Sequence, residues 1–334
     1  MDARISWLRI TACFLIVLLH VSGEQAVHVG PGWLIANIYN ASSHVCVPIF
    51  LMISGVSLLT KSEPLLVFVR KRLIRIVPPL VFWSCVYLAW LSYNGIETSN
   101  WFLAILKGPT MYHLWYLYAV IGLYALVPVM RRFYQGATRA EKLWALSLWL
   151  AVGSAWPAVS KALSPDTCMS TFPATWIGIY QLSVFGSYAG FLLLGAMLNE
   201  FKISGRAGMI MFVAGSLLAL LATCWQTARI GSVCQAFYEY TSPFIILASI
   251  GFFSMFLSTK PKAPSAFVAR VADCTLGTYC LHVLIIGGIF PRMGFGAEGR
   301  DVWLTAPLMA IGGFLISMVL VYGVRLTKIG RFVS

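Results

Sequence analysis

Long apolar runs separated by short polar connections dominate the pattern of hydrophobic and polar positions along this chain. A helix that crosses the hydrocarbon core of a bilayer needs roughly 20 mostly apolar residues, and ten runs meet that length. We expect spans at about residues 4–23, 37–59, 73–93, 113–130, 143–160, 176–198, 207–226, 237–258, 274–291 and 302–324. No connection is long enough for a soluble domain. The pattern predicts an all-α polytopic integral membrane protein, with residues 1–334 forming one transmembrane domain.

The composition leads to the same class of protein. Of the 334 residues, 59% are hydrophobic and only 10% are charged, and the mean hydropathy is +0.82. Soluble domains carry about 25% charged residues, so this chain cannot cover itself with a polar surface. A soluble enzyme, a DNA-binding protein and a disordered scaffold are therefore excluded.

The basic residues predict the orientation of the spans. An even number of spans puts both chain ends on one side of the membrane. If that side is the cytoplasm, nineteen Lys and Arg lie inside and five outside, as the positive-inside rule requires. We therefore expect both termini in the cytoplasm, and we assign the net charge of +13 to topology and not to a nucleic-acid partner.

The eight cysteines show no spacing typical of metal ligands, so we expect no metal site. Cys168, Cys224 and Cys234 lie near predicted outer loops. A Cys224–Cys234 disulfide is one pairing that these positions allow.

Three ionisable residues lie on one stripe of the first predicted span. Arg9 and His20 are eleven helical steps apart, about 1100° or three turns plus about 20°, so they share a face at an axial separation of ~16 Å. Glu24, four residues further on, is placed to hold the imidazole of His20 in one tautomer. Arg9 could instead be a topology anchor and His20 an interface residue. Ionisable groups inside membranes usually face a cavity or a partner, which favours a functional role for the pair.

Two further arginines mark the inner boundary of the third span. Arg72 and Arg75 are three residues apart and therefore neighbours on a helix face. Their guanidinium groups would suit phosphate oxygens, although a topology anchor or a lipid-headgroup contact explains them as well. In the second span, the small residues Ser54 and Gly55 would let helices approach closely.

Two more histidines occur in the outer half of the predicted bundle. His113 opens the fourth span, and His282 lies within the ninth, one turn after Tyr279. Histidines toward the outer half and guanidinium groups at the inner face would suit an anionic ligand that enters from the cytoplasm with its reactive end reaching across. A transporter could show the same polarity.

Five motifs in this order resemble those of the membrane-bound acyltransferase 3 family. The matching residues are Arg9-x10-His20, Val47-Pro48-Ile49-Phe50-Leu51-Met52-Ile53-Ser54-Gly55, Arg72-x-x-Arg75-Ile76-x-Pro78, His113-Leu114-Trp115-Tyr116 and Gly277-x-Tyr279-x-x-His282. The second motif is most similar to the branch that contains enterobacterial-common-antigen O-acetyltransferase. It departs from the commoner family pattern by Leu51 in place of an aromatic residue.

The resemblance implies transfer of an acyl group, typically acetyl, from cytoplasmic acyl-coenzyme A to a hydroxyl of a cell-surface or lipid-linked polysaccharide. It implies a multi-pass protein of the bacterial inner membrane whose donor is acetyl-coenzyme A. The donor-binding residues would be Arg9, Ser54, Arg72 and Arg75. The catalytic residues would be His20 as general base, Glu24 beside it, and His113, Tyr279 and His282 as candidate donors to the oxyanion.

Two other classes of function remain open at this point. A transporter or flippase of glycans or acyl-bearing small molecules would use the same histidines to line a pathway, but the chain shows no correspondence between two halves. A membrane scaffold would leave the buried ionisable residues unexplained.

Overall fold

The computed structural model describes residues 2–163, 168, 188–296, 301–327 and 330, and all regular secondary structure in them is helical. Among these residues, eight helices are long and apolar enough to cross a membrane, and the bent pair of α13 with the segment Thr275–Arg292 makes a ninth if it is one span. The protein is therefore a multi-pass membrane protein, and the all-α prediction is confirmed.

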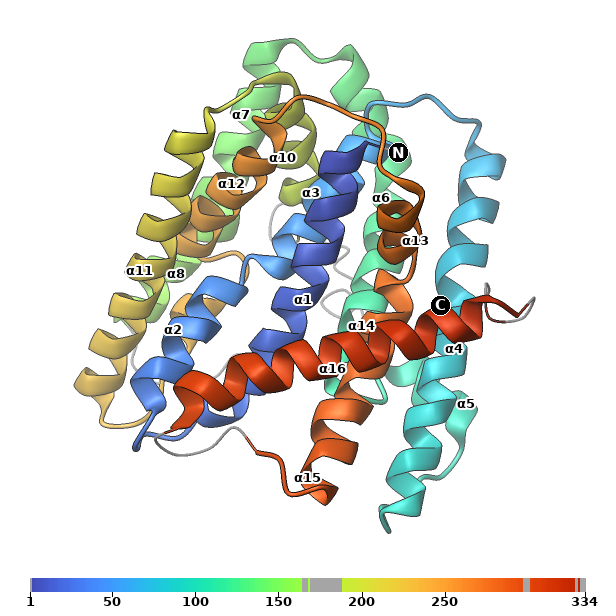
Figure 1. The fold of residues 1–334 in the computed structure, drawn as a ribbon. Coiled ribbons are helices and arrows are strands. Elements are labelled where there is room, and N and C mark those ends of the chain that lie inside the picture. Colours follow the sequence, from blue (N-terminus) through green and yellow to red (C-terminus); the bar gives the residue numbers. More distant parts are fainter. Residues whose placement is uncertain (1, 164–167, 169–187, 297–300, 328–329, 331–334) are drawn as a thin grey trace.

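The elements follow one another as a bundle of helices (Figure 1). In chain order they are α1 (Ala3–Ala26), α2 (Trp33–Ser43), α3 (Cys46–Leu58), α4 (Leu65–Tyr93), α5 (Trp101–Lys107), η1 (Tyr112–Leu114), α6 (Trp115–Gly136), α7 (Arg139–Leu150), η2 (Ala151–Ala155), α8 (Trp156–Leu163), α10 (Ala189–Glu200), α11 (Gly205–Ile230), η4 (Ala236–Tyr238), α12 (Pro243–Leu257), α13 (Ala266–Asp273), α14 (Thr275–Leu284), η5 (Ile285–Ile289), α15 (Phe290–Arg292) and α16 (Val302–Arg325).

Three predicted spans differ from the structure in their detail. The second is divided into α2 and α3 at His44. The ninth, 274–291, corresponds to α14, η5 and α15, and a bend of 50° at its start joins it to α13. The sixth, 176–198, lies largely outside the described residues, and its described part is α10, which at twelve residues is too short to span a bilayer alone.

Close packing between α3 and α10 depends on glycine, as the small residues of the second span predict. A Cβ atom on Gly55 would lie 1.9 Å from the carbonyl oxygen of Leu192, and one on Gly195 would lie 2.3 Å from that of Met52. Two helices can approach this closely only where no side chain stands between their backbones. The glycine pair therefore fixes α3, which supplies one wall of the site, against the rest of the bundle.

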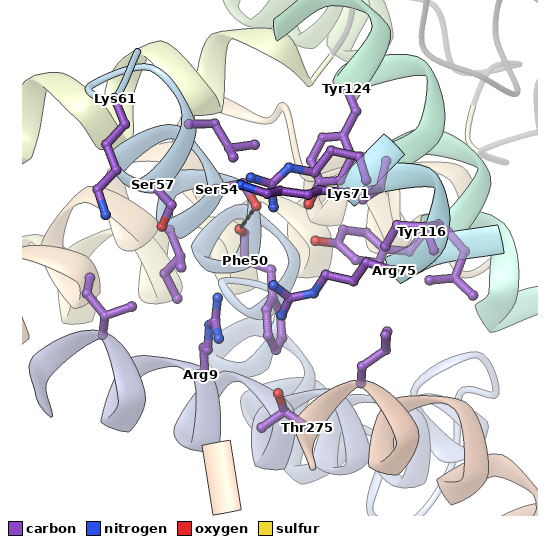
Figure 2. Close-up of a pocket in the computed structure, with 18 of the residues that line it drawn as sticks. Arg9, Phe50, Ser54, Ser57, Lys61, Lys71, Arg75, Tyr116, Tyr124 and Thr275 are labelled. Carbon is purple, nitrogen blue, oxygen red and sulfur yellow. Dashed lines mark hydrogen bonds between the residues drawn. The ribbon is translucent and has the colours of Figure 1, made fainter. Parts of the chain in front are cut away.

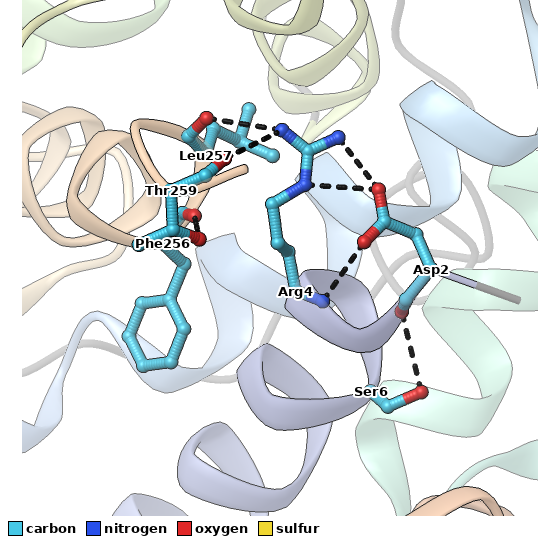
Figure 3. A network of polar contacts seen from close by, with 6 residues as sticks. All are labelled: Asp2, Arg4, Ser6, Phe256, Leu257 and Thr259. Atoms are coloured by element: carbon cyan, nitrogen blue, oxygen red, sulfur yellow. Dashed lines mark hydrogen bonds and ion pairs between the residues drawn. The ribbon is translucent and has the colours of Figure 1, made fainter. Parts of the chain in front are cut away.

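The beginning of α1 is joined to the end of α12 by Arg4 (Figure 3). Its guanidinium group pairs with Asp2 at 2.6 Å and donates hydrogen bonds to the carbonyl oxygens of Leu257 (3.0 Å) and Thr259 (3.4 Å). Carbonyls at a helix C-terminus lack partners within the helix, and a cation is favoured beside them. This network holds the end of α1 that carries Arg9.

The disulfide joins Cys168 to Cys234, so the Cys224–Cys234 pairing was wrong. Cys224 is a free cysteine in α11, where it packs against the apolar cluster of Ala219 and Leu220. Its side chain therefore packs in a helix interface and does not reach the loop that carries Cys234.

Candidate functional site

A cavity of about 720 Å³ lies between α1, α3, α4, α6 and the bent pair α13–α14 (Figure 2). Sites for small molecules and cofactors typically enclose roughly 300–1,000 Å³. All four predicted donor-binding residues line it, namely Arg9, Ser54, Arg72 and Arg75. The cavity is therefore large enough for a nucleotide-sized ligand and carries the predicted cations on its walls.

The charged side chains of the cavity are mostly cationic. Six Lys or Arg line it against two acids, and the six are Arg9, Lys61, Lys71, Arg72, Arg75 and Arg131. Arg9 from α1 and Arg75 from α4 extend into the same space (Figure 2). Such a set of cations within one cavity favours a ligand with several negative charges.

Arg72 is held in place by aromatic rings. Its guanidinium carbon lies 5.3 Å from the centre of the Phe68 ring and 5.9 Å from that of Tyr124. Its Nε is buried and has no hydrogen-bond partner among the described residues. The Arg72 guanidinium group is thus oriented by the two aromatic rings, and its Nε–H can donate to an acceptor atom of a ligand.

A layer of histidines lies one helical turn beyond one end of the cavity. On three helices, the residue one turn beyond the last cavity-lining residue is a histidine: His20 follows Ile16 on α1, His113 precedes Tyr116 at α6, and His282 follows Tyr279 on α14. The spacing of three or four residues puts each histidine on the cavity-facing side of its helix. The cavity therefore runs along α1 from Arg9 toward His20.

The three histidine rings lie against one another. Their centroids are 5.0 Å apart for His20 and His282, 5.5 Å for His113 and His282, and 6.3 Å for His20 and His113. His113 and His282 are buried, at 1% and 0% exposure, and His20 is partly buried. In the described part of the chain no group of three or more His, Cys, Asp or Glu is arranged to hold a metal ion.

Main-chain carbonyls determine where the protons of the neutral imidazoles lie. His282 Nδ1 is 2.5 Å from the carbonyl oxygen of Tyr279, and a carbonyl only accepts, so Nδ1 carries the proton and Nε2 has the lone pair. That Nε2 lies 3.4 Å from His20 Nδ1, which therefore donates. The lone pair of His20 is then on Nε2, the nitrogen that a general base would use.

His113 is held in the same way by the neighbouring carbonyl. Its Nε2 donates to the carbonyl oxygen of Cys280 at 3.2 Å, which also accepts from the Tyr87 hydroxyl at 2.7 Å. The Tyr279 hydroxyl in turn donates to the carbonyl oxygen of His113. His113 Nδ1 is left as a buried lone pair without a hydrogen-bond partner among the described residues.

The predicted roles of Glu24 beside His20 and of Ser54 in donor binding remain predictions. Glu24 is exposed on the last turns of α1, and the hydrogen bond to His20 Nδ1 involves His282. The Ser54 hydroxyl donates to the carbonyl oxygen of Phe50, one turn earlier in α3, at 2.9 Å.

Several residues of the site were not identified from the sequence. Lys71 lies in the Arg70-Lys71-Arg72 run, and Arg131 was assigned only to topology although it lines the cavity. His44 does not line the cavity; it stands at the break between α2 and α3, where its ring stacks on Tyr238 with centroids 4.9 Å apart.

Comparison with known proteins identifies one family. No curated protein and no solved structure matches the chain. The family model described as "Acyltransferase domain" matches residues 2–322, nearly the whole chain. The protein therefore belongs to the acyltransferase 3 family and is a multi-pass membrane acyltransferase.

Proposed function

We propose that this protein is an O-acetyltransferase of the bacterial inner membrane that moves acetyl from cytoplasmic acetyl-coenzyme A to a hydroxyl of a cell-surface or lipid-linked polysaccharide. One observation carries the proposal: a cavity lined by cations lies one helical turn from three histidines, one of which has a lone pair directed by a chain of hydrogen bonds. The cations would match the phosphates of the donor, and the histidines would match its thioester.

Coenzyme A has phosphates at one end and a thioester at the end of a long arm, and the cavity has the same polarity. Arg72 and Arg75, together with Lys71, would bind the phosphates. Arg9 and His20 are ~16 Å apart along α1, so the arm would lie along this helix. The thioester would then reach Tyr279, the lining residue one turn before His282.

In the proposed orientation, the donor entrance faces the cytoplasm, and both termini lie on the same side. The nineteen-to-five distribution of Lys and Arg supports it. The Cys168–Cys234 disulfide supports it independently, because disulfides persist in oxidising compartments and both cysteines belong to predicted outer connections. The acceptor would approach the histidines from that outer side.

In the proposed reaction, the acceptor hydroxyl oxygen attacks the thioester carbon while its proton passes to His20 Nε2. The Nδ1 proton would remain in the hydrogen bond to His282 Nε2, and sharing it would spread part of the positive charge onto that ring. When the C–S bond breaks, the coenzyme A sulfur leaves with the electron pair and takes a proton back from His20. Direct transfer is preferred, and a transient acyl-His20 is the alternative.

Tyr279 is the residue best placed to donate to the oxyanion. It lines the cavity and also contacts the histidine layer, with its ring centroid 5.6 Å from that of His113. Its hydroxyl has one proton, which goes to the His113 carbonyl in this structure, and that bond would be exchanged for one to the oxyanion. In the tautomers described above, His113 Nδ1 and His282 Nε2 present lone pairs and cannot donate.

The acceptor class rests on the resemblance of residues 47–55 to the enterobacterial-common-antigen O-acetyltransferase branch. We extend the proposal to the whole of residues 1–334 as one catalytic domain, with Glu24 and Ser54 in supporting roles.

The decisive experiment supplies isotope-labelled acetyl-coenzyme A to the cytoplasmic face of membrane vesicles and measures base-labile label in the glycan fraction. His20→Gln should abolish the label while the protein still inserts and binds donor. His28→Gln is the matched control, because His28 is exposed just after α1, and it should retain activity. Glycan movement without ester formation would refute the proposal in favour of a transporter.

A further inference from the structure

The mouth of the cavity contains an acid among its cations. Glu63 lies in the connection between α3 and α4, and its side chain is only 17% exposed. One carboxylate oxygen accepts from Lys71 Nζ at 2.5 Å, and the other lies 3.8 Å from an Arg72 nitrogen. The Glu63 carboxylate is therefore paired with Lys71 and Arg72, two of the cations that would bind the donor phosphates.

This acid is ionised at neutral pH. The hydrogen bond from Lys71, together with the charges of Lys71, Arg72 and Arg131, lowers the pKa of the Glu63 carboxyl below its ordinary value. The group therefore contributes a full negative charge to a cavity lined by six cations.

The main chain beside Glu63 is fixed independently of its carboxylate. Arg131 donates to the carbonyl oxygens of Leu58 (2.8 Å) and Glu63 (3.2 Å), and Gln135 donates to that of Leu59 at 3.2 Å. Rotation of one side chain would free Lys71 and Arg72 without moving the connection.

We propose that Glu63 is an exchangeable counter-ion that holds Lys71 and Arg72 in the empty site and is displaced by the phosphates of the donor. The inference rests on the proposed function, because it assumes a polyphosphate ligand in this cavity. A phosphate group carries more charge than a carboxylate and offers more acceptor oxygens. Replacement of the Glu63 carboxylate by a donor phosphate is therefore favourable. Because the donor must compete with Glu63 for Lys71 and Arg72, this carboxylate lowers the affinity for the donor.

The test measures binding of coenzyme A and of adenosine 3′,5′-bisphosphate to the purified full chain in lipid nanodiscs by calorimetry. Glu63→Gln keeps the shape of the side chain and removes its charge. It should tighten binding by about 5-fold, because the donor phosphates no longer compete with a charged carboxylate for Lys71 and Arg72. The gain should shrink at high salt, because exposed charges are screened.

Glu200→Gln is the matched control. Glu200 pairs with Lys142 at 3.7 Å and lies outside the cavity lining, so its replacement should leave binding unchanged. Equal or weaker binding by Glu63→Gln would overturn the inference and make Glu63 a residue that preorganises the site. If the wild-type protein bound neither probe, the assignment of the donor itself would fail, and the two failures are thus distinguishable.

Discussion

His282 offers the most direct test of how the histidine layer would work. We predict that its replacement lowers kcat by leaving His20 Nδ1–H without an acceptor. In the structure, the Tyr279 carbonyl fixes the tautomer of His282, and His282 Nε2 fixes that of His20. In His282→Ala both constraints disappear, and His20 divides between two tautomers, of which one has its lone pair on the wrong nitrogen.

The size of the effect follows from the hydrogen bond that is lost. At 3.4 Å this bond is long, and a net value of about 1 kcal/mol corresponds to about 5-fold in the ratio of the two tautomers. The fraction of the correct tautomer falls by at most this factor, so we expect kcat to fall by up to about 5-fold, well short of the ~10²-fold loss expected on removing the base itself. His282→Gln, whose amide oxygen can accept, should recover part of the loss.

The assay separates kcat from KM. His282 does not line the cavity, so the KM for acetyl-coenzyme A should not change. A thermal unfolding scan of each variant controls for the cavity that alanine leaves in a buried site. An unchanged kcat in a folded His282→Ala protein would refute the proposed chain of hydrogen bonds.

The remaining predictions concern the donor-binding arginines, the packing of α3 against α10, Glu63 and the membrane topology. Arg72→Ala or Arg75→Ala should raise the KM for acetyl-coenzyme A, and Lys should do so less because it retains the charge but not the fork; unchanged binding in the double alanine variant would contradict this. Gly55→Ala should lower the unfolding temperature, since overpacking costs about 1–3 kcal/mol, whereas Gly323→Ala, with no atom within 4 Å of the added Cβ, should not. The lowered pKa of Glu63 implies a contribution to stability that is present above its unfolded pKa and lost as the pH falls through its folded pKa; unfolding scans should show the wild-type advantage over Glu63→Gln at neutral pH and not in acid. Cysteine labelling after residues 65, 135 and 265 should report the cytoplasm, and after 165 and 295 the outside; two reversals would overturn the topology.

The sequence determined the properties that depend on neighbours along the chain. An apolar run must form a helix in lipid because its own backbone is the only source of hydrogen bonds there, so the spans could be predicted from hydropathy. The shared face of Arg9 and His20 follows from helical geometry alone. The motifs that resemble the acyltransferase 3 family are of the same local kind, and the match over residues 2–322 bears them out at the level of the family.

Only the tertiary structure decided which of these faces meet. Lipid is as apolar as the side chains of the spans, so hydropathy does not specify the neighbours of a membrane helix; close packing and interhelical hydrogen bonds do. The approach of His113 and His282 to His20, the pairing of Glu63 with Lys71 and the joining of Cys168 to Cys234 all involve such neighbours. The position of the proton on His20 is the clearest case, because it depends on a main-chain carbonyl of α14, which no residue type encodes.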